Sequence, residues 1–355
     1  MENLYDLIII GSGPAGLSAA IYAQRARLDT LVIEKDMMSG GQVLTTYEVD
    51  NYPGLPGING FDLGTKFREH ADKLGVRFVT DQVERVELGA RQARRDGNLE
   101  ETEERGELLK AAELAGNERM PETYGEDFIK NVICGENTYK ARAVVIATGA
   151  RHRKLEVPGE EKLAGMGVSY CATCDGAFFR NRDVAVVGGG DVALEDAIFL
   201  SRMCRKVYLI HRRDELRGAK SLQETVFRQE NIQILWDTVV KEIQGEMKVE
   251  GLRLENKNTG EETGLNVQGV FIAVGITPNS QIFQGLVDTE KGYIKAGEDT
   301  RTSVPGIFAA GDVRTKMLRQ IVTAAADGAN GVTAAERYLA DLNIPYENSA
   351  SPSMA

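Results

Sequence analysis

The sequence predicts an α/β protein built from two dinucleotide-binding domains, the second inserted into the first. Glycine-rich turns at residues 11–16 and 188–190 each follow a short apolar run and precede a segment of helical composition. A Cys-x-x-Cys pair at 171–174 lies shortly before the second turn. Two nucleotide sites and one dithiol indicate electron transfer between a nicotinamide and a disulfide.

Length and composition limit the possible classes of protein. A chain of 355 residues can form two domains, each with its own core. The net charge of −11 argues against a nucleic-acid partner. No basic region precedes the first apolar run, and no run approaches the length of a membrane span, so we expect a cytoplasmic protein with no membrane partner. With four cysteines, the pair is more readily catalytic or metal-binding than part of a structural framework.

The first glycine turn has the context that makes such a motif specific. Residues 5–10 form an apolar strand, residues 17–26 are helical in composition, and residues 30–34 form a second strand that ends in Glu34. The glycines allow a pyrophosphate to approach the helix N-terminus, and Glu34 can accept ribose hydroxyls. An acidic residue would repel a 2′-phosphate, so this site suits FAD or NAD. The simpler alternative is a glycine turn without a ligand.

The second turn repeats this pattern with a different charge. A strand is expected at 184–187, a helix at 193–203 and another strand at 207–210. His211 follows Gly188 by the same 23 residues that separate Glu34 from Gly11. The basic cluster that begins there would hold a 2′-phosphate and so favours NADPH; it comprises His211, Arg212, Arg213 and Arg217. The alternative is a solvated basic surface.

Further segments define the predicted domain boundaries. Residues 143–149 form a strand that ends in a tight turn, residues 270–275 repeat it, and the amides at 309–312 could meet a phosphate or flavin edge. We therefore expect an FAD domain at 1–150 and 280–355, and an NADPH domain at 151–279. A charged insertion at 89–127 has six basic and eleven acidic side chains, a net charge of −5. A solvated helical insertion is the simpler interpretation, and a partner or oligomer contact is the alternative.

The cysteine pair favours redox chemistry over zinc binding. A Cys-x-x-Cys loop lowers the pKa of one thiol, and the adjacent Asp175 could supply or remove a proton. A zinc site needs two further ligands, but Cys134 and Cys204 are isolated in apolar surroundings and the three histidines form no close pair. We interpret Cys134 and Cys204 as small core residues.

The motifs together carry a resemblance to a known family. They are GSGPAG at 11–16, GGQ at 40–42, NYPG at 51–54, CATCDGAFF at 171–179, HRRDELR at 211–217 and the run from Gly311 to Ala329. Over nearly its whole length the chain resembles the low-molecular-weight bacterial thioredoxin reductases. That resemblance implies two Rossmann-like, three-layer ββα domains joined by a two-strand hinge, in a homodimer with one FAD per subunit. It also implies that NADPH reduces FAD, FAD reduces the 171–174 disulfide, and the dithiol reduces thioredoxin.

Individual site residues follow from the same resemblance. It implies that Cys174 is the sulfur nearer the flavin, that Cys171 attacks thioredoxin, and that Asp175 is the acid–base residue. The implied FAD positions are Gly11, Ser12, Gly13, Pro14, Ala15, Gly16, Glu34, Lys35, Gly41, Gln42, Asn51, Val83, Ala147, Thr148, Gly149, Gly311, Asp312, Arg319, Gln320 and Ile321. The implied NADPH positions are Gly188, Gly190, Asp191, Val192, Ala193, His211, Arg212, Arg213, Arg217 and Gly275.

The chain departs from the family pattern at two places. Val192 stands where members often carry serine, and the 89–127 insertion is longer than the turn expected there. The sequence leaves two other activities on the same fold as alternatives. One is a reductase that takes electrons from ferredoxin, and the other is a reductase whose acceptor is a glutaredoxin-like protein or a peroxidase-system protein. A ferredoxin–NADP reductase would lack the cysteine pair, and a flavin-bound redox sensor would not turn over.

Overall fold

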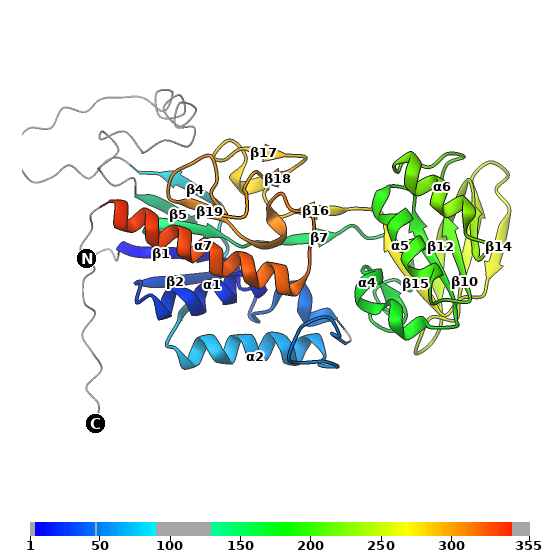
Figure 1. The fold of residues 1–355 in the computed structure, drawn as a ribbon, viewed down its shortest axis with the longest axis horizontal. Helices are drawn as coiled ribbons and strands as arrows, with labels where there is room; N and C mark the ends of the chain where they lie inside the picture. The colour runs from blue at the N-terminus through cyan, green and yellow to red at the C-terminus, as the bar shows by residue number, and fades with distance from the viewer. Residues whose placement is uncertain (1–3, 47, 90–128, 343–355) are drawn as a thin grey trace, which may run out of the picture. The chain divides into compact units, whose positions relative to one another are not determined.

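The computed structural model describes residues 4–46, 48–89 and 129–342, and the chain divides into two compact units (Figure 1). The first unit comprises residues 1–44, 61–150 and 278–355. The second comprises residues 45–60 and 151–277. Beyond Gly89, the charged insertion and the helix expected within it lie outside the described residues.

The first unit is organised around a seven-stranded sheet with the order β3-β2-β1-β6-β5-β4, in which β19 also pairs with β6. Strands β1, β2, β3, β6 and β19 run parallel, and β4 and β5 are antiparallel additions. Ile10 pairs with Ile33 on one side and with Ile146 on the other, which fixes the register of the central strands. The strands are β1 (Leu4–Ile10), β2 (Thr30–Glu34), β3 (Arg77–Thr80), β4 (Arg85–Leu88), β5 (Lys130–Cys134), β6 (Asn137–Ile146) and β19 (Ile307–Ala309).

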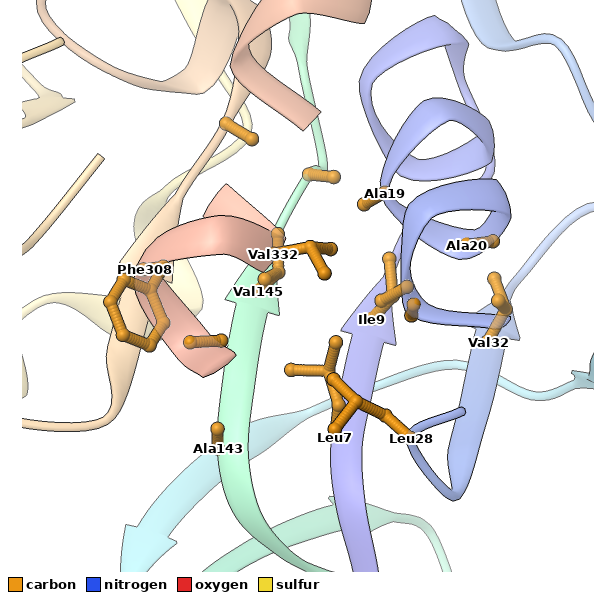
Figure 2. Packing of buried hydrophobic residues seen from close by; sticks show 14 of the residues in the cluster. Leu7, Ile9, Ala19, Ala20, Leu28, Val32, Ala143, Val145, Phe308 and Val332 are labelled. Atoms are coloured by element: carbon orange, nitrogen blue, oxygen red, sulfur yellow. The ribbon is translucent and has the colours of Figure 1, made fainter. Parts of the chain in front are cut away.

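Side chains of alternate strand residues face two different layers of the first unit. Leu7 and Ile9 of β1 belong to a core formed with the helices α1 (Pro14–Arg25) and α7 (Ile321–Asp341), where Val145, Phe308 and Val332 also pack (Figure 2). Ile8 and Ile10 face the other side, which short segments cover: β17 (Thr289–Glu290), β18 (Tyr293–Ile294), η4 (Gln281–Phe283) and η5 (Gly311–Val313). Helix α2 (Gly60–Lys73) and the turn η1 (Gly41–Thr45) complete the described elements of this unit.

The two long helices α1 and α7 approach each other closely at Gly328. A Cβ at this position would lie 2.1 Å from the carbonyl oxygen of Ala15 and 2.8 Å from the amide nitrogen of Ala19, so only glycine allows the contact. The alanines of α1 keep the interface thin, since Ala15, Ala19, Ala20 and Ala23 are all buried there. Small residues therefore bring the start of α7, and the loop before it, close to the first glycine turn.

The second unit has a five-stranded parallel sheet in the order β11-β10-β9-β15-β8. Helices pack on one face around Phe271 and Leu200, and a three-stranded antiparallel sheet packs on the other around Ile272 and Leu252. The sheet strands are β8 (Val168–Ser169), β9 (Asp183–Gly188), β10 (Lys206–Ile210), β11 (Ile232–Leu235) and β15 (Gly269–Ala273). The covering elements are α4 (Ala172–Asp175), η3 (Gly176–Phe179), α5 (Asp191–Ser201), α6 (Lys220–Arg228), β12 (Thr238–Gln244), β13 (Gly251–Asn256) and β14 (Glu262–Leu265).

The chain passes between the units within two short strands that pair with each other, β7 (Ala150–His152) and β16 (Ile276–Pro278), and again on either side of residues 45–60. The predicted α/β class with two dinucleotide-binding folds, one inserted into the other, is confirmed. The predicted strands at 5–10, 30–34, 184–187 and 207–210 are present within one or two residues of their expected ends. The helix expected at 193–203 begins and ends two residues earlier, because α5 begins directly after Gly190. Within the described residues, no helix combines the length and apolarity that crossing a membrane requires.

Candidate functional site

The first glycine turn is held by the end of the second strand. Gly16 lies where α1 packs on β1, and a Cβ there would lie 1.9 Å from the carbonyl oxygen of Gly11. Oε2 of Glu34 accepts hydrogen bonds from the amide and the hydroxyl of Ser12, both at 2.7 Å. Its Oε1 accepts the amide of Asp36 at 3.1 Å. Glu34 therefore fixes the second residue of the turn and places a carboxylate beside the N-terminus of α1.

A second polar group of the first unit lies in the turn η5, at Asp312. Its Oδ1 is buried and has no hydrogen-bond partner among the described residues, and the same holds for Nε of Arg319. The Arg319 guanidinium carbon lies 4.1 Å from the centre of the Tyr293 ring. Burial raises the pKa of Asp312, while the charges of Lys316 and Arg319 lower it. Buried polar atoms without partners are rare in proteins, so these two mark a place where a polar ligand fits.

A buried ion cluster supports that turn from behind. Asp327 of α7 accepts hydrogen bonds from Nε and Nη2 of Arg314, at 2.8 and 2.7 Å, and from the ammonium of Lys316 at 2.8 Å. It also accepts the amide of Gly311, the residue before Asp312, at 2.9 Å. The sequence interpretation missed Arg314 and Asp327. The only signal of a buried ion pair was the position of Asp327, a carboxylate between Ala324 and Gly328 on the buried face of α7.

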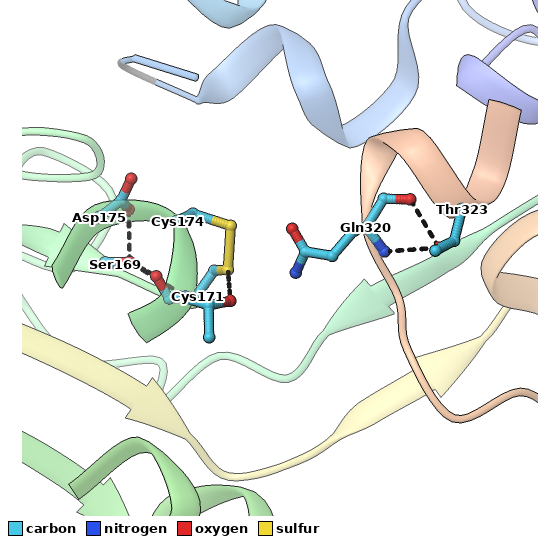
Figure 3. Close-up of a disulfide and its surroundings, with 7 residues drawn as sticks. Ser169, Cys171, Cys174, Asp175, Gln320 and Thr323 are labelled. Atoms are coloured by element: carbon cyan, nitrogen blue, oxygen red, sulfur yellow. Dashed lines mark hydrogen bonds between the residues drawn. A yellow bond between two sulfur atoms is a disulfide. The ribbon is translucent and has the colours of Figure 1, made fainter. Parts of the chain in front are cut away.

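The remaining implied FAD positions have diverse surroundings. Val83 and Ala147 are buried, Thr148 donates its hydroxyl to the carbonyl oxygen of Asn279 at 2.7 Å, and Gln320 begins α7 in a capping box with Thr323 (Figure 3). Lys35, Gly41 and Gln42 are exposed. Asn51 belongs to the second unit, whereas every other implied FAD position belongs to the first.

In the second unit, His211 occupies the position equivalent to Glu34 but has a different role. Its ring lies over the turn, because a Cβ at Gly189 would be 2.2 Å from Nδ1 of His211. The Nε2 atom lies 2.9 Å from the carbonyl oxygen of Glu215. Burial holds the pKa of His211 below its ordinary value; hydrogen bonds with the backbone of Glu215 and Gly188 raise it, and the charges of Arg217 and Arg213 lower it. His211 is therefore a packing residue of the turn, and the permanent charge around the cavity comes from other groups.

The loop that carries Arg217 is tied directly to the turn. The amide of Arg217 donates to the carbonyl oxygen of Gly189 at 2.7 Å. The amide of Ala219 donates to Oδ1 of Asp191, the first residue of α5, also at 2.7 Å. Asp191 thus holds the loop in place and does not line the cavity described next. Its neighbour Val192 has 51% of its surface exposed, and Ala193 is buried below the turn.

A cavity of about 910 Å³ opens in the second unit beside this turn. Of the implied NADPH positions, Gly188, His211, Arg212 and Arg217 line it, whereas Gly190, Asp191, Val192, Ala193, Arg213 and Gly275 do not. Its permanent cations are Arg151, Arg153, Lys154, Arg212 and Arg217, against the one carboxylate of Glu156. Such a surplus of positive charge suits a ligand with several phosphates. The sequence interpretation missed residues 151–156, although the basic run after the strand was a visible signal.

The wall formed by residues 151–156 is held by a buried acid. Glu160 accepts the amides of Leu155 and Glu156, at 3.0 and 2.7 Å, and the hydroxyl of Tyr170 at 2.7 Å. Tyr170 stacks on His152 with ring centres 5.3 Å apart. Because Tyr170 directly precedes Cys171, this chain of contacts joins the cavity wall to the strand that leads into the cysteine pair.

Cys171 and Cys174 form a disulfide at the start of the short helix α4, which Cys171 caps (Figure 3). The carboxyl of Asp175, the last residue of α4, lies 2.5 Å from the hydroxyl of Ser169 through Oδ2. Its Oδ1 is buried without a hydrogen-bond partner in the described part of the chain. Burial raises the pKa of Asp175, and the Ser169 hydrogen bond lowers it. Sequence reasoning missed Ser169, which lies only two residues before the pair.

The other two cysteines are buried free thiols, which confirms their interpretation as core residues. Burial raises the pKa of Cys134 to about 12 and that of Cys204 to about 11, so both remain protonated. Among residues 4–46, 48–89 and 129–342, no group of three or more His, Cys, Asp or Glu side chains is arranged to bind a metal ion.

Two dinucleotide-binding folds and a redox disulfide define the class of protein: a nucleotide-dependent disulfide oxidoreductase. Residues 5–328 match the family described as pyridine nucleotide-disulphide oxidoreductase, and the chain belongs to this family. A thioredoxin reductase of Listeria monocytogenes is 44% identical, with 99% of this chain and 98% of that protein aligned. The thioredoxin reductase of Bacillus subtilis is 42% identical, with 96% of each chain aligned. The crystal structure of thioredoxin reductase from Streptococcus pyogenes superimposes with a TM-score of 0.81 at 41% identity, over 96% of this chain and 99% of that chain.

Proposed function

We propose that this enzyme takes electrons from NADPH, with FAD as its bound flavin, and delivers them through the Cys171–Cys174 pair to thioredoxin. In the overall reaction, NADPH and one proton reduce one thioredoxin disulfide to a dithiol and leave NADP⁺. The observation that carries the proposal is the disulfide itself, bonded in the same compact unit as a cationic nucleotide-sized cavity. The full-length similarity to thioredoxin reductases supports the choice of acceptor.

The residues of the first unit fit FAD. The unpartnered atoms of Asp312 and Arg319 match the polar chain of the flavin nucleotide, and the turn at 11–16 with Glu34 matches a pyrophosphate and a ribose. We assign the FAD domain to residues 1–150 and 280–355, which includes residues 45–60 of the second compact unit. When bound, the flavin supplies the two-electron chemistry that links a nicotinamide to a disulfide.

The residues of the second unit fit NADPH better than NADH. A 2′-phosphate adds negative charge, and five permanent cations around the cavity favour it over a plain ribose. Arg217 is the best candidate for this contact because its loop is fixed to the glycine turn by two backbone hydrogen bonds, from the amides of Arg217 and Gly218 to the carbonyl oxygen of Gly189. Arg213 donates no lining group to the cavity, so we give it a smaller part. The NADPH domain is assigned to residues 151–279.

The cysteine pair has a proposed division of roles. Cys174 is the sulfur nearer the flavin, and Cys171 attacks the thioredoxin disulfide as a thiolate. Asp175 exchanges a proton with the pair, since its raised pKa allows it to hold a proton nearer to neutral pH than an ordinary aspartate. We further propose that the enzyme is a cytoplasmic homodimer, as the family resemblance implies.

One experiment tests the proposal. The purified protein is loaded with FAD, and the loss of NADPH absorbance is followed with thioredoxin and a chromogenic disulfide. Continuous oxidation of NADPH that depends on thioredoxin is the expected result. If a glutaredoxin-like protein is reduced and thioredoxin is not, the enzyme has a different acceptor. If reduced ferredoxin supports turnover and NADPH does not, it has a different electron donor. A protein that binds FAD but never turns over would be a sensor, and the proposed function would be wrong.

A further inference from the structure

Ser169 has the geometry of a residue that positions the acid–base group. It ends strand β8, and only 4% of its surface is exposed. Its hydroxyl oxygen lies 2.5 Å from Oδ2 of Asp175 and accepts the backbone amide of Cys171 at 3.0 Å (Figure 3). One small side chain therefore links the residue that caps α4 to the last residue of α4.

The distances around Ser169 favour one acceptor for its single hydroxyl proton. The two acceptors within reach are Oδ2 of Asp175 at 2.5 Å and the carbonyl oxygen of Cys171 at 3.3 Å. Hydrogen bonds between a hydroxyl and an oxygen are ordinarily about 2.5–3.0 Å long. A serine has only one proton to donate, and the nearer acceptor, Oδ2 of the ionised Asp175, takes it. In the neutral carboxyl the same hydrogen bond is kept when the proton lies on Oδ1, because Oδ2 then remains an acceptor.

The other oxygen of Asp175 is left for the proton. Oδ1 is buried and has no partner among the described residues, and an ionised oxygen in that situation carries a large desolvation cost. We propose that Ser169 is a positioning residue of the dithiol reaction, which fixes Oδ2 of Asp175 so that Oδ1 carries the exchanged proton. This inference rests on the proposed function, in which Asp175 exchanges a proton with the cysteine pair.

The proton balance of the step is simple. Reduction breaks the bond between Cys171 and Cys174 and takes up two electrons, which the oxidation of NADPH supplies. The two sulfurs then take up two protons, one from Oδ1 of Asp175 and one from solvent. When the dithiol reduces an acceptor disulfide, its two electrons pass to the acceptor; one of its protons returns to Asp175 and the other goes to the acceptor, which takes its second proton from solvent. Ser169 bonds more strongly to the ionised carboxyl than to the neutral one, so it favours release of the proton.

Other ionisable groups near α4 need separate control. The elements packed against α4 are η3, which has no ionisable side chain, and α5, which has Asp191, Glu195 and Asp196. Burial and the charge of Glu195 raise the pKa of Asp196 to about 7. A change of activity near neutral pH could therefore arise from Asp196 instead of Asp175. Asp175 is the carboxyl of α4 itself, and reduction adds the thiol of Cys174 on this helix and that of Cys171, which caps it.

The test compares hydroxyl-bearing and hydroxyl-free residues of equal shape. The variants Ser169→Thr and Ser169→Val form a matched pair, and Ser169→Ala removes the hydroxyl alone. Ser201→Ala is the control, because among the described residues the Ser201 hydroxyl bonds the Ile198 carbonyl of its own helix, at 2.8 Å, and no group of the cysteine pair. In the FAD-loaded enzyme, the rate at which NADPH reduces the cysteine pair is measured against pH. We expect the ionisation assigned to Asp175 to rise by about one pH unit in Ser169→Ala and Ser169→Val, a tenfold change in proton affinity. Ser169→Thr and Ser201→Ala should keep the wild-type profile.

A second readout needs no turnover. The infrared carbonyl band of protonated Asp175, identified by its loss in Asp175→Asn, is titrated in the resting enzyme and should persist to higher pH in Ser169→Ala. The Ser169→Ala shift should vanish in an Asp175→Asn background and survive in Asp196→Asn. An unchanged band in an active enzyme, or a shift that survives without Asp175, would overturn the role of Ser169 alone. A wild type in which NADPH never reduces the pair would instead overturn the proposed function.

Discussion

Replacing Asp327 with asparagine tests the buried ion cluster behind the Asp312 turn. Asp327 lies on α7 with its side chain 4% exposed, and its two cationic partners, Arg314 and Lys316, are 3% and 5% exposed. Asparagine preserves the size of the side chain and removes its charge. Arg314 then retains an ion pair with the exposed Glu298, at 3.7 Å, and Lys316 retains the nearby carboxyl of Asp312. The amide of Gly311 loses an ionised acceptor.

The expected magnitude follows from the burial of all three groups. Removing one partner of a buried ion pair typically lowers the free energy of unfolding by about 3–5 kcal/mol. For a domain of this size, that corresponds to a melting temperature lower by about 10 °C. Loss of the charged hydrogen bond to Gly311 should also weaken FAD binding by about tenfold or more, since such a bond is worth about 1.5–3 kcal/mol.

The assay is urea unfolding of the flavin-loaded and flavin-stripped protein, together with an FAD titration. Asp341→Asn is the matched control, because Asp341 lies on the same helix and is exposed. The double variant of Asp327→Asn with Arg314→Gln should lose less stability than the sum of the single variants, because the two groups share one network. If Asp327→Asn unfolds within about 1 kcal/mol of the wild type, as for a surface pair, the reasoning is refuted.

The pH dependence of this difference has a definite sign. Burial raises the pKa of Asp327, but the hydrogen bonds and charges of Arg314 and Lys316 outweigh it and hold the pKa below its ordinary value of 3.8. A carboxyl with a depressed pKa stabilises the fold above its unfolded pKa, and this contribution is lost as the pH falls through the folded pKa. The gap in stability between wild type and Asp327→Asn should therefore be constant from about pH 5 to pH 8 and shrink below about pH 4.

Three other experiments probe the site more directly. Cys171→Ser and Cys174→Ser should each abolish thioredoxin reduction while NADPH still reduces bound flavin in stopped-flow traces; near-normal turnover would contradict the electron path. Arg217→Ala should raise the KM for NADPH by about tenfold and spare that for NADH, whereas the exposed Arg228→Ala should change neither. Iodoacetamide at neutral pH should label two cysteines of the reduced native enzyme and all four after unfolding, because burial raises the pKa of Cys134 to about 12 and also protects the other buried thiol. Labelling of three or four in the native state would refute this.

Local patterns in the sequence were sufficient to predict the two folds. A glycine turn between an apolar strand and an alanine-rich helix is encoded within about 30 contiguous residues, so its elements can be read without tertiary information. The common 23-residue spacing also located Glu34 and His211 at the same structural position, the end of the second strand. The cysteine pair was recognisable for the same reason, since its two members are only three residues apart.

What could not be predicted depends on contacts between distant segments. The cavity brings residues 151–156, the turn at 188–189 and the loop around Arg217 together, and no periodicity in the sequence links them. Asp327 bonds Arg314 across the loop before α7. The strength of this ion pair depends on its burial, which cannot be predicted from a carboxylate in a helical sequence. Ser169 needed only the local bend of α4 to reach Asp175, but serine is too common near turns to signal a partner.

The two glycine turns show how one backbone arrangement serves two chemistries. At the first turn, Glu34 reaches back and accepts both donors of Ser12, so the strand end contributes a negative charge to the site. At the second, the ring of His211 fills the space beside Gly189, and burial lowers its pKa, although the sequence had assigned it to the basic cluster. Around this cavity the positive charge comes from Arg212 and Arg217 on loops, from Arg151 in strand β7, and from Arg153 and Lys154, which directly follow that strand. The charge that favours one nucleotide over another therefore lies at the end of the second strand in the first unit, and on segments around the turn in the second.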